Sequence, residues 1–327
     1  MKILFCQLRN HGDIIRTFPL MDAIKSIHPN WKIGFTCYEE MVQTCLLCKN
    51  IDIIIPQKRF KPVTDIQGGT RVLDCSILSE SIKDARKEKF DLYVDLHGVF
   101  QSAIFGTLCN IDNRLGRSEK TAKDGAHFFY NNICEINERE INRMERHFLV
   151  INHLFGEINP LKIERDKQIS KILLFPGSSQ AGKLKRWPIE SYIKLGGILN
   201  KKYEVTYAIG PEEQELISAI RKNSKDHILM INDWQSITDN IEQNDMVVGN
   251  DGAYMHIAVW KGVPAVILCG PTSPVINGVW KYGVGSTVNS GVVCACEDPW
   301  SGICVDCKHC MDRIPVDAVL GEIEKYV

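Results

Sequence analysis

The strongest constraint on the fold is a repeated alternation of short apolar runs with longer segments of helical periodicity. In the first half, strands are predicted at residues 2–8, 32–37, 51–55 and 92–95, and helices at residues 14–28, 39–47, 77–89, 100–109 and 138–155. Strands separated by helices pair in parallel, and a parallel sheet needs helices on both faces. This half of the sequence therefore predicts a doubly wound α/β domain.

The same alternation restarts after residues 156–170, a polar segment that is typical of a linker. Beyond it, strands are predicted at residues 171–175, 204–209, 246–249 and 265–269, and helices at residues 189–201, 212–222, 254–261 and 316–326. The 327 residues exceed what one hydrophobic core usually holds. We predict an α/β protein of two Rossmann-like domains, residues 1–160 and 161–327, whose parallel sheets face a central cleft. The sequence leaves open whether the last helix packs back on the N-terminal domain.

Charge and hydropathy exclude several classes of protein. The chain carries 39 Lys and Arg residues against 40 Asp and Glu residues, so it has no bulk attraction for nucleic acid, and we expect no nucleic-acid partner. An anionic ligand must then be held by a local cluster of charges. The longest apolar runs are strand-sized, far below the roughly 20 residues that cross a bilayer. The first eight residues are too short for a secretory signal, and we expect a cytoplasmic protein.

Ligands of open parallel sheets bind where the carboxyl ends of strands lead into helices. After the first predicted strand, Gly12 permits a tight turn and Asp13 stands where a helix N-cap would stand. The Asp13 carboxylate has two interpretations of similar weight. It is either an ordinary N-cap or a general base at the mouth of the cleft.

A second turn combines small residues, hydroxyls and cations before a helix. It contains Gly177, Ser178, Ser179, Lys183, Lys185, Arg186 and Pro188. Backbone N–H groups and cations in such a loop can share a phosphate, which predicts a phosphate-binding site. The alternative is a basic loop exposed to solvent. The patterns GxxxxGK[ST] and GxGxxG are both absent, which excludes a P-loop and disfavours a nicotinamide oxidoreductase.

A third turn, Asp251-Gly252-Ala253, leads from a predicted strand into the helix that carries His256. Small residues there let a ligand approach the positive end of the helix. For His256, a buried and satisfied side chain is the commoner alternative. A fourth polar turn, Gly270-Pro271-Thr272, follows the strand at residues 265–269.

Taken in order, these motifs resemble the bacterial family 9 glycosyltransferases, the ADP-heptose:lipopolysaccharide heptosyltransferases. The similarity runs through Gly12-Asp13 with Thr17 and Pro19, Asp95-Leu96-His97-Gly98 with Ser102-Ala103, Pro176-Gly177-Ser178, Lys185-Arg186-Trp187-Pro188, Gly210-Pro211-Glu212-Glu213, Gly249-Asn250-Asp251 through His256, and Gly270-Pro271-Thr272. The last two blocks are the most specific, and the likeness covers nearly the whole chain.

This resemblance implies a GT-B fold, an acceptor on the N-terminal domain, an ADP-sugar on the C-terminal domain, and transfer with inversion that requires no cofactor. It implies that Asp13 deprotonates the acceptor hydroxyl and that Lys185 stabilises charge growing on the diphosphate. Glu213 is expected to bind the ribose. The implied donor-binding set is Gly177, Ser178, Ser179, Lys183, Arg186, Glu213, Asp251, Gly252, Ala253 and His256. The implied acceptor-binding set is Gly12, Lys58, Arg59, Lys61, His97 and Gln101.

The acceptor side is less determined than the donor side. The three basic residues Lys58, Arg59 and Lys61 suit an anionic glycan or glycolipid, and solvated surface charge is an equal alternative. Arg143 and Arg146 are weaker candidates. His97 and Gln101 stand where the family commonly has Gln and Lys, and Gly252 and Ala253 replace a hydroxyl residue and a glycine. The resemblance places the enzyme in the cytoplasm and leaves open peripheral contact with the inner membrane.

Five cysteines fall within 17 residues, at Cys294, Cys296, Cys304, Cys307 and Cys310. Thiolates at this spacing suit a structural zinc or iron ion held by Cys296, Cys304, Cys307 and Cys310, with His309 as an alternative ligand. The family commonly has cysteines here, so reduced, packed thiols are the other interpretation.

The predicted function is an inverting transfer of a heptose or related sugar from an ADP-sugar to a lipopolysaccharide-core or other glycan. Two alternatives remain, a transferase or epimerase of the same fold that uses a UDP-sugar, and a non-catalytic subunit that binds a nucleotide sugar.

Overall fold

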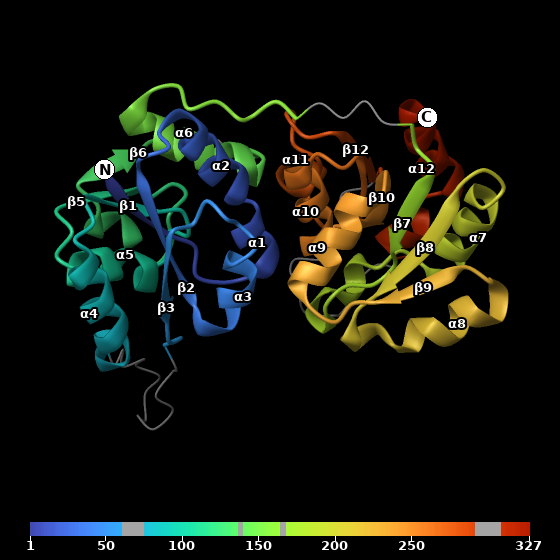
Figure 1. Ribbon diagram of the computed structural model, residues 1–327, viewed down its shortest axis with the longest axis horizontal. Helices are drawn as coiled ribbons and strands as arrows, with labels where there is room; N and C mark the ends of the chain where they lie inside the picture. The colour runs from blue at the N-terminus through green and yellow to red at the C-terminus, as the bar shows by residue number, and fades with distance from the viewer. Residues whose placement is uncertain (61–74, 137–139, 164–167, 292–308) are drawn as a thin grey trace. The chain divides into compact units, whose positions relative to one another are not determined.

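The computed structural model describes residues 1–60, 75–136, 140–163, 168–291 and 309–327. The chain divides into two compact units (Figure 1). The first comprises Met1–Arg139 and Met144–Leu161, and the second comprises Glu140–Arg143 and Lys162–Val327. No helix of the described residues combines the length and the apolarity that a membrane span requires.

The first unit contains strands β1 (Lys2–Cys6), β2 (Lys32–Tyr38), β3 (Ile53–Gln57), β4 (Leu92–Asp95), β5 (Asn113–Arg117) and β6 (Asn132–Cys134). Its helices are α1 (His11–Ile15), α2 (Phe18–Ile27), α3 (Val42–Cys45), α4 (Ser79–Glu88), α5 (Phe100–Leu108) and α6 (Arg143–Phe155), with 3₁₀ helices η1 (Glu39–Met41), η2 (Cys75–Leu78) and η3 (Ala126–Phe129).

The second unit contains strands β7 (Lys171–Phe175), β8 (Glu204–Ile209), β9 (His227–Met230), β10 (Met246–Asn250), β11 (Ala265–Cys269) and β12 (Gly285–Asn289). Its helices are α7 (Ile189–Leu199), α8 (Glu215–Asn223), α9 (Trp234–Gln243), α10 (Ala253–Lys261), α11 (Pro274–Asn277) and α12 (Val316–Ile323), with 3₁₀ helices η4 (Gln180–Lys185), η5 (Pro211–Glu213), η6 (Cys310–Arg313) and η7 (Glu324–Tyr326).

Both sheets are six-stranded and parallel, and they share one topology. The strand order is β3-β2-β1-β4-β5-β6 in the first sheet and β12-β11-β10-β7-β8-β9 in the second. In each sheet the chain therefore starts at a central strand, builds one side of the sheet and then returns to build the other side. The strand order reverses between β1 and β4 in the first sheet and between β7 and β10 in the second. This arrangement confirms the prediction of two Rossmann-like α/β folds, and it marks these two strand pairs as the expected ligand sites.

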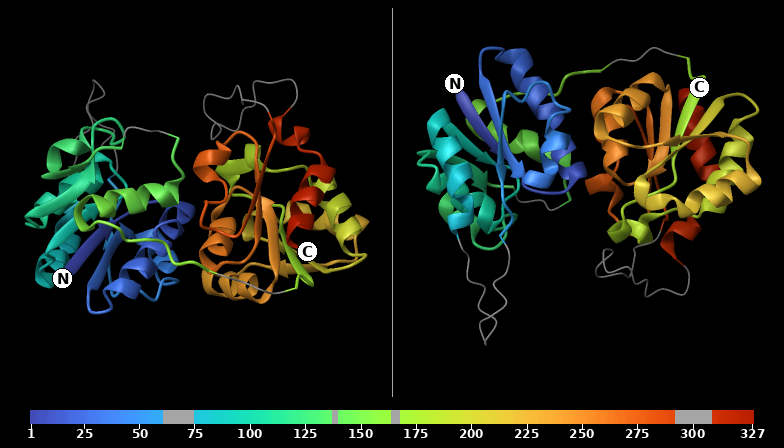
Figure 2. Two further views of the ribbon diagram at one scale, coloured as in Figure 1. Left: turned by 90° about the horizontal axis from the view of Figure 1, so that it is seen from above. Right: turned by 60° about the horizontal axis from the view of Figure 1, so that its bottom comes forward.

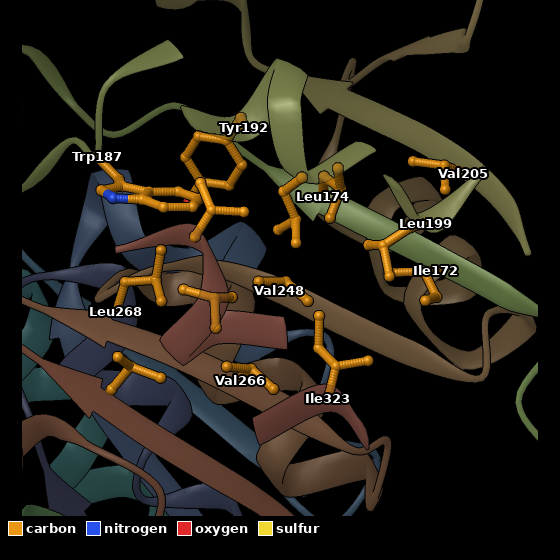
Figure 3. Close-up of a cluster of buried hydrophobic side chains, with 14 of the residues drawn as sticks. Ile172, Leu174, Trp187, Tyr192, Leu199, Val205, Val248, Val266, Leu268 and Ile323 are labelled. Atoms are coloured by element: carbon orange, nitrogen blue, oxygen red, sulfur yellow. The ribbon is translucent and has the colours of Figure 1, made fainter. Parts of the chain in front are cut away.

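Continuous apolar strands explain why the centre of each sheet is buried. All five residues of β10 and of β11 are buried, as parallel strands covered on both faces require. In the second unit, α9 packs on α10 while α7 packs on α8 and α12, and helices cover both faces of the sheet (Figure 2). In the hydrophobic core of this unit, the rings of Trp187 and Tyr192 pack with the side chains of Leu174 and Val248 (Figure 3).

The last helix packs within its own unit. Val319 and Ile323 of α12 are buried in the core of the second unit, where the helix meets α7 and β12. Its apolar face is thus used within the second unit.

Several predicted helices differ from the observed ones. The helices expected over residues 39–47, 212–222 and 316–326 are each divided between a 3₁₀ helix and an α-helix, η1 with α3, η5 with α8, and η7 with α12. The helix expected over residues 14–28 is instead the pair α1 and α2, because Pro19 at the start of α2 cannot donate to the turn before it and its ring clashes there. The helix expected from residue 138 begins at Arg143. Asn142 is not helical, and its amide donates to the carbonyls of Val275 (3.3 Å) and Gly278 (3.1 Å).

The predicted strands omitted β5, β6, β9 and β12. Three of these are edge strands, whose residues are largely half-buried or exposed, so they show no apolar run. In β5, Leu115 is flanked by Gly116, where an added Cβ would overlap the Tyr130 ring. The core there is filled by an aromatic ring from elsewhere in the chain, which the local pattern cannot reveal.

Candidate functional site

In the first unit, the loops after β1 and β4 come together at the carboxyl edge of the sheet. The strands pair in parallel from Ile3–Leu92 to Cys6–Asp95. The loop after β1 carries Gln7 and leads to Asp13, and the loop after β4 carries His97. Because ligands of open parallel sheets bind at such a reversal point, this edge is the candidate acceptor site.

Asp13 lies within the first turn of α1 and not at its N-cap. The N-cap is Asn10, which makes no capping bond with its side chain, so the N-cap interpretation of Asp13 is wrong. The Asp13 side chain is 14% exposed and forms an ion pair with Arg16, Nη1 to Oδ1, at 2.9 Å. Asn10 Nδ2 donates to the other oxygen at 3.0 Å. Sequence reasoning missed Arg16, although an acid and a base three residues apart on a helix are the signal for such a pair.

A buried carboxylate fixes the turn that follows β4. Asp95 Oδ1 accepts hydrogen bonds from the backbone N–H groups of His97 (2.9 Å) and Gly98 (2.8 Å). Its Oδ2 accepts from the hydroxyls of Ser102 (2.7 Å) and Tyr130 (2.6 Å). Desolvation raises the pKa of Asp95 above its usual value despite these donors. The sequence placed Asp95 and Ser102 in one motif, and the structure shows that the motif holds the His97 turn rigid.

Two histidines at this edge are held neutral by their surroundings. Burial, with the nearby guanidinium groups of Arg9, Arg117 and Arg146, lowers the pKa of His97 to about 4, while Asp13 opposes this. His147 on α6 is 2% exposed, and burial with the charges of Arg146 and Arg117 holds its pKa well below the usual value. The charges of Asp13, Arg117 and Arg146 thus shift the pKa of both imidazoles. These three side chains and the two histidines form one cluster.

This cluster makes the first unit sensitive to acid. The His147 pKa is lower in the folded protein than the usual 6.5, so the unfolded state binds more protons as the pH falls. The free energy of unfolding should therefore be retained above about pH 6.5 and decline below it, by up to about 1.4 kcal/mol per pH unit for this group. His147→Gln is expected to remove that part of the slope.

The measurement is urea unfolding at about pH 7 and about pH 5, read from the hydrogen exchange of β1 and β4 peptides. His153→Gln, an exposed position on the same helix, is the matched control. An unchanged slope in His147→Gln would show that the histidine is not held neutral.

The other predicted acceptor residues lie around the same edge. Gly12 is in α1. Lys58 is 55% exposed and 3.8 Å from Glu80, and Arg59 pairs with Glu40 at 2.7 Å. Gln101 is 6% exposed, and its side chain bonds to other parts of the protein. Its Oε1 accepts a hydrogen bond from the Tyr38 hydroxyl at 2.9 Å, and its Nε2 donates to the Lys58 carbonyl at 3.0 Å. Lys61 lies outside the described residues.

In the second unit, Asn250 ties together the loops after β7 and β10. Its Nδ2 donates to the carbonyls of Pro176 and Gly177, both at 3.0 Å, and its Oδ1 accepts from the Trp187 backbone at 2.9 Å. This residue positions the predicted phosphate loop. The sequence analysis named Asn250 within a motif but gave it no role, although an amide at the end of an apolar strand is a signal for such a structural contact.

Lys185, Asp251 and His256 form one buried polar group. Lys185 Nζ donates to the Asp251 carbonyl at 2.8 Å and lies 3.5 Å from its Oδ2. His256 Nε2 lies 3.4 Å from Asp251 Oδ1. Lys185 is 8% exposed, so the solvated-loop alternative is wrong for this residue. Gly252 is the N-cap of α10 and Ala253 its first residue, which places the positive helix end beside Asp251.

The other residues predicted to bind the diphosphate lie on the loop that carries Lys185. Arg186 donates to Ser178, from Nε to Oγ at 3.0 Å and from Nη2 to the carbonyl at 2.6 Å, and pairs with Glu215 at 2.7 Å. Ser179 is the N-cap of η4, and both it and Lys183 are exposed.

Glu213 is a buried carboxylate that lies against the phosphate loop. It is 6% exposed, and its Oε2 accepts from the Gly210 N–H at 2.8 Å. A Cβ on Gly177 would overlap the carboxyl group of Glu213. Glycine at position 177 therefore allows the carboxylate to reach the loop.

Gly177→Ala is expected to displace the Glu213 carboxylate and to weaken nucleotide binding, roughly tenfold for a lost charged hydrogen bond. Calorimetric titration with ADP measures it. Gly197→Ala on α7 is the matched control, since a Cβ there meets nothing within 4 Å. Equal ADP affinity in the two variants would contradict a role for Glu213 in binding.

Most of the predicted metal site lies outside the described residues, which exclude Cys296, Cys304 and Cys307. Cys310 is described and is buried beside Gly270, while His309 Nδ1 accepts from the Met311 backbone at 3.2 Å. Within the described part of the chain, no three His, Cys, Asp or Glu side chains are grouped so as to hold a metal ion. The metal site stays a prediction.

Comparison with known proteins identifies the chain's relatives. Residues 80–297 match glycosyltransferase family 9 (heptosyltransferase). A lipopolysaccharide heptosyltransferase 1 from Campylobacter coli is 23% identical over 336 aligned positions, which cover 89% of this chain and 90% of that protein. A family 9 glycosyltransferase from Veillonella parvula superposes with a TM-score of 0.77 at 18% identity, covering 99% and 96% of the two chains. The E. coli heptosyltransferase WaaC, solved with ADP-2-deoxy-2-fluoro heptose, gives 0.75 at 17% identity and covers both chains fully.

The similarity to these solved structures shows the GT-B fold. The family match spans every predicted donor-binding residue, whereas Asp13 lies before it. With two thirds of its residues matched and both sheets of the fold in place, the chain belongs to glycosyltransferase family 9 and is a glycosyltransferase.

Proposed function

We propose that this enzyme transfers a heptose from ADP-heptose to the core of lipopolysaccharide. Relatives that carry the name lipopolysaccharide heptosyltransferase, and the WaaC complex with an ADP-heptose analogue, support the donor and the acceptor class. The observation that carries the proposal is the buried group Lys185, Asp251 and His256 beside the Gly177 loop and Glu213. It offers a cation, a helix N-terminus and a carboxylate, which suit a diphosphate and a ribose.

On the donor side, each group has a stated role. Lys185, Arg186, Lys183 and the hydroxyls of Ser178 and Ser179 bind the diphosphate, together with the N-terminus of α10 at Gly252 and Ala253. Glu213 binds the ribose hydroxyls. Asp251 and His256 line the pocket for the sugar and its phosphate.

The reaction is an inverting displacement. Asp13 accepts the proton of the acceptor hydroxyl, and that oxygen forms a bond to the anomeric carbon on the face opposite ADP. The bond from the anomeric carbon to the phosphate oxygen breaks, and its electron pair leaves with ADP. Lys185 stabilises the charge that develops on the diphosphate.

On the acceptor side, the cationic edge of the first unit suits an anionic glycan. Gly12, Lys58, Arg59, His97 and Gln101 form or border this edge. Lys61, which lies outside the described residues, is proposed to bind the acceptor with them. With a lipid-linked acceptor, the enzyme would work at the cytoplasmic face of the inner membrane.

A nucleotide screen followed by a transfer assay tests the proposal. Calorimetry against ADP, UDP, GDP and CDP should show a clear preference for ADP. Mass spectrometry should then detect one added heptose on heptose-free lipopolysaccharide after incubation with ADP-heptose. Preference for UDP would favour a transferase or epimerase that uses a UDP-sugar, and ADP-heptose binding without transfer would favour a non-catalytic subunit.

A further inference from the structure

The imidazole of His97 is fixed in one tautomer by a neighbouring amide. Gln7 Nε2 lies 2.8 Å from His97 Nδ1 and 3.5 Å from the Arg9 carbonyl. An amide NH₂ group can only donate, so Nδ1 is the acceptor and carries no proton. With the Gln7 amide in this orientation, the ring proton is assigned to Nε2.

The backbone of His97 is held as firmly as its ring. Its N–H donates to Asp95 Oδ1 at 2.9 Å, and its carbonyl accepts from Arg117 Nη2 at 2.6 Å. Gly98 beside it has a φ of +73°, and an added Cβ would overlap the Arg117 guanidinium. A histidine held at its ring Nδ1 and at two backbone atoms is preorganised to present Nε2–H in one direction.

The surroundings of this donor are cationic. The charges with the largest effect on the His97 ring are the guanidinium groups of Arg9 after β1, Arg117 of β5 and Arg146 of α6, opposed by the Asp13 carboxylate of α1. Three guanidinium groups near this ring favour a bound anion. The same cations disfavour a protonated ring, so the neutral donor persists at neutral pH.

We propose that His97 is an acceptor-specificity residue, whose Nε2–H donates to an anionic oxygen of the acceptor near the hydroxyl that Asp13 deprotonates, with Gln7 as its positioning residue. This inference rests on the proposed function. The anionic oxygen belongs to a carboxylate or a phosphate, which share the required chemistry.

The tautomer is tested directly on the whole chain. Long-range ¹H–¹⁵N NMR of ¹⁵N-histidine protein, with the His97 signals assigned by their loss in His97→Gln, should show Nε2 protonated and Nδ1 bare. Detergent-dispersed heptose-free lipopolysaccharide should shift the Nε2 signal. A proton on Nδ1 would overturn the inference, whether or not the protein transfers heptose.

Gln7→Glu tests the positioning role. A carboxylate can only accept from Nδ1, so it reverses the tautomer and leaves Nε2 without its proton. The acceptor KM should rise roughly tenfold, as for a lost hydrogen bond to a charged group, while the KM for ADP-heptose stays unchanged. Lowering the pH protonates the ring, restores Nε2–H and should lower the acceptor KM again.

The wild-type enzyme should show no such pH dependence of acceptor KM through the usual histidine range. Gln7→Met, which removes the amide and offers no acceptor, should lack this recovery at low pH. An acceptor KM in Gln7→Glu equal to that of wild type at every pH would overturn the inference.

Two treated acceptors distinguish the sources of the anion. Phosphatase removes phosphates from heptose-free lipopolysaccharide, and carbodiimide amidation neutralises its carboxylates. His97→Leu should raise the KM for untreated acceptor, and His97→Gln, which keeps a donor, should restore it in part. The effect of His97→Leu should vanish with the treatment that removes the contacted group. Persistence after both treatments would contradict an anionic contact, and failure of the wild type to transfer heptose would count against the proposed function instead.

Discussion

Asp13→Asn is expected to lower kcat about 100-fold, the usual contribution of a general base, with the affinity for ADP-heptose unchanged. An amide cannot take the proton from the acceptor hydroxyl, but it keeps the size of the side chain and its bond from Asn10. Arg16 loses its ion pair with the Asp13 carboxylate but stays in a cationic edge that still attracts an anionic acceptor. Steady-state kinetics with heptose-free lipopolysaccharide gives kcat, and calorimetry gives the donor affinity.

Asp84→Asn is the matched control, because Asp84 is an exposed carboxylate on α4 and has no role in the proposed reaction. Near-normal turnover in Asp13→Asn would remove this residue from its role as the base. A fall in donor affinity equal to the fall in kcat would assign it to binding.

Lys185→Ala should raise the dissociation constant for ADP by roughly 10- to 100-fold, since a hydrogen bond to a charged group contributes about 1.5–3 kcal/mol. The Lys185 ammonium lies beside the buried Asp251 carboxylate, at 3.5 Å. Its removal takes a cation from beside the Asp251 carboxylate, so the site would lose an attraction for the diphosphate and the negative charge of Asp251 would oppose binding more strongly. Calorimetric titration with ADP measures the change.

Lys194→Ala, an exposed lysine on α7, controls for the loss of one positive charge from the unit. The two variants should differ in ADP affinity while their far-UV circular dichroism stays the same. Unchanged affinity in Lys185→Ala would exclude Lys185 from the phosphate site.

The central strands of both sheets were predictable because each lies in a continuous apolar run. The observed bounds of β4, β7, β8 and β11 agree with those expected from the sequence. The edge strands were not predictable, since half-exposed residues such as those of β9 leave no apolar signature. The break between α1 and α2 could have been read from Pro19, whose effect on a helix is local.

The candidate site residues also divide into those that the sequence indicated and those that it did not. Turns at the ends of apolar strands indicated Asp13, Gly177 and Asp251, because the carboxyl edge of a parallel sheet is fixed by the order of the elements. Their partners came from elsewhere in the chain. Asn250 holds the loop at residues 176–177 across 73 positions, and Gln7 meets His97 across 90.

The sequence by itself determined that this chain forms two parallel α/β units and which turns carry polar residues, because apolar periodicity and turn chemistry are local properties. Only the tertiary structure decided that Lys185 is buried against Asp251 and that the Gln7 amide lies against Nδ1 of His97. Those outcomes depend on the distance and burial of side chains on separate loops, and no local pattern records either quantity.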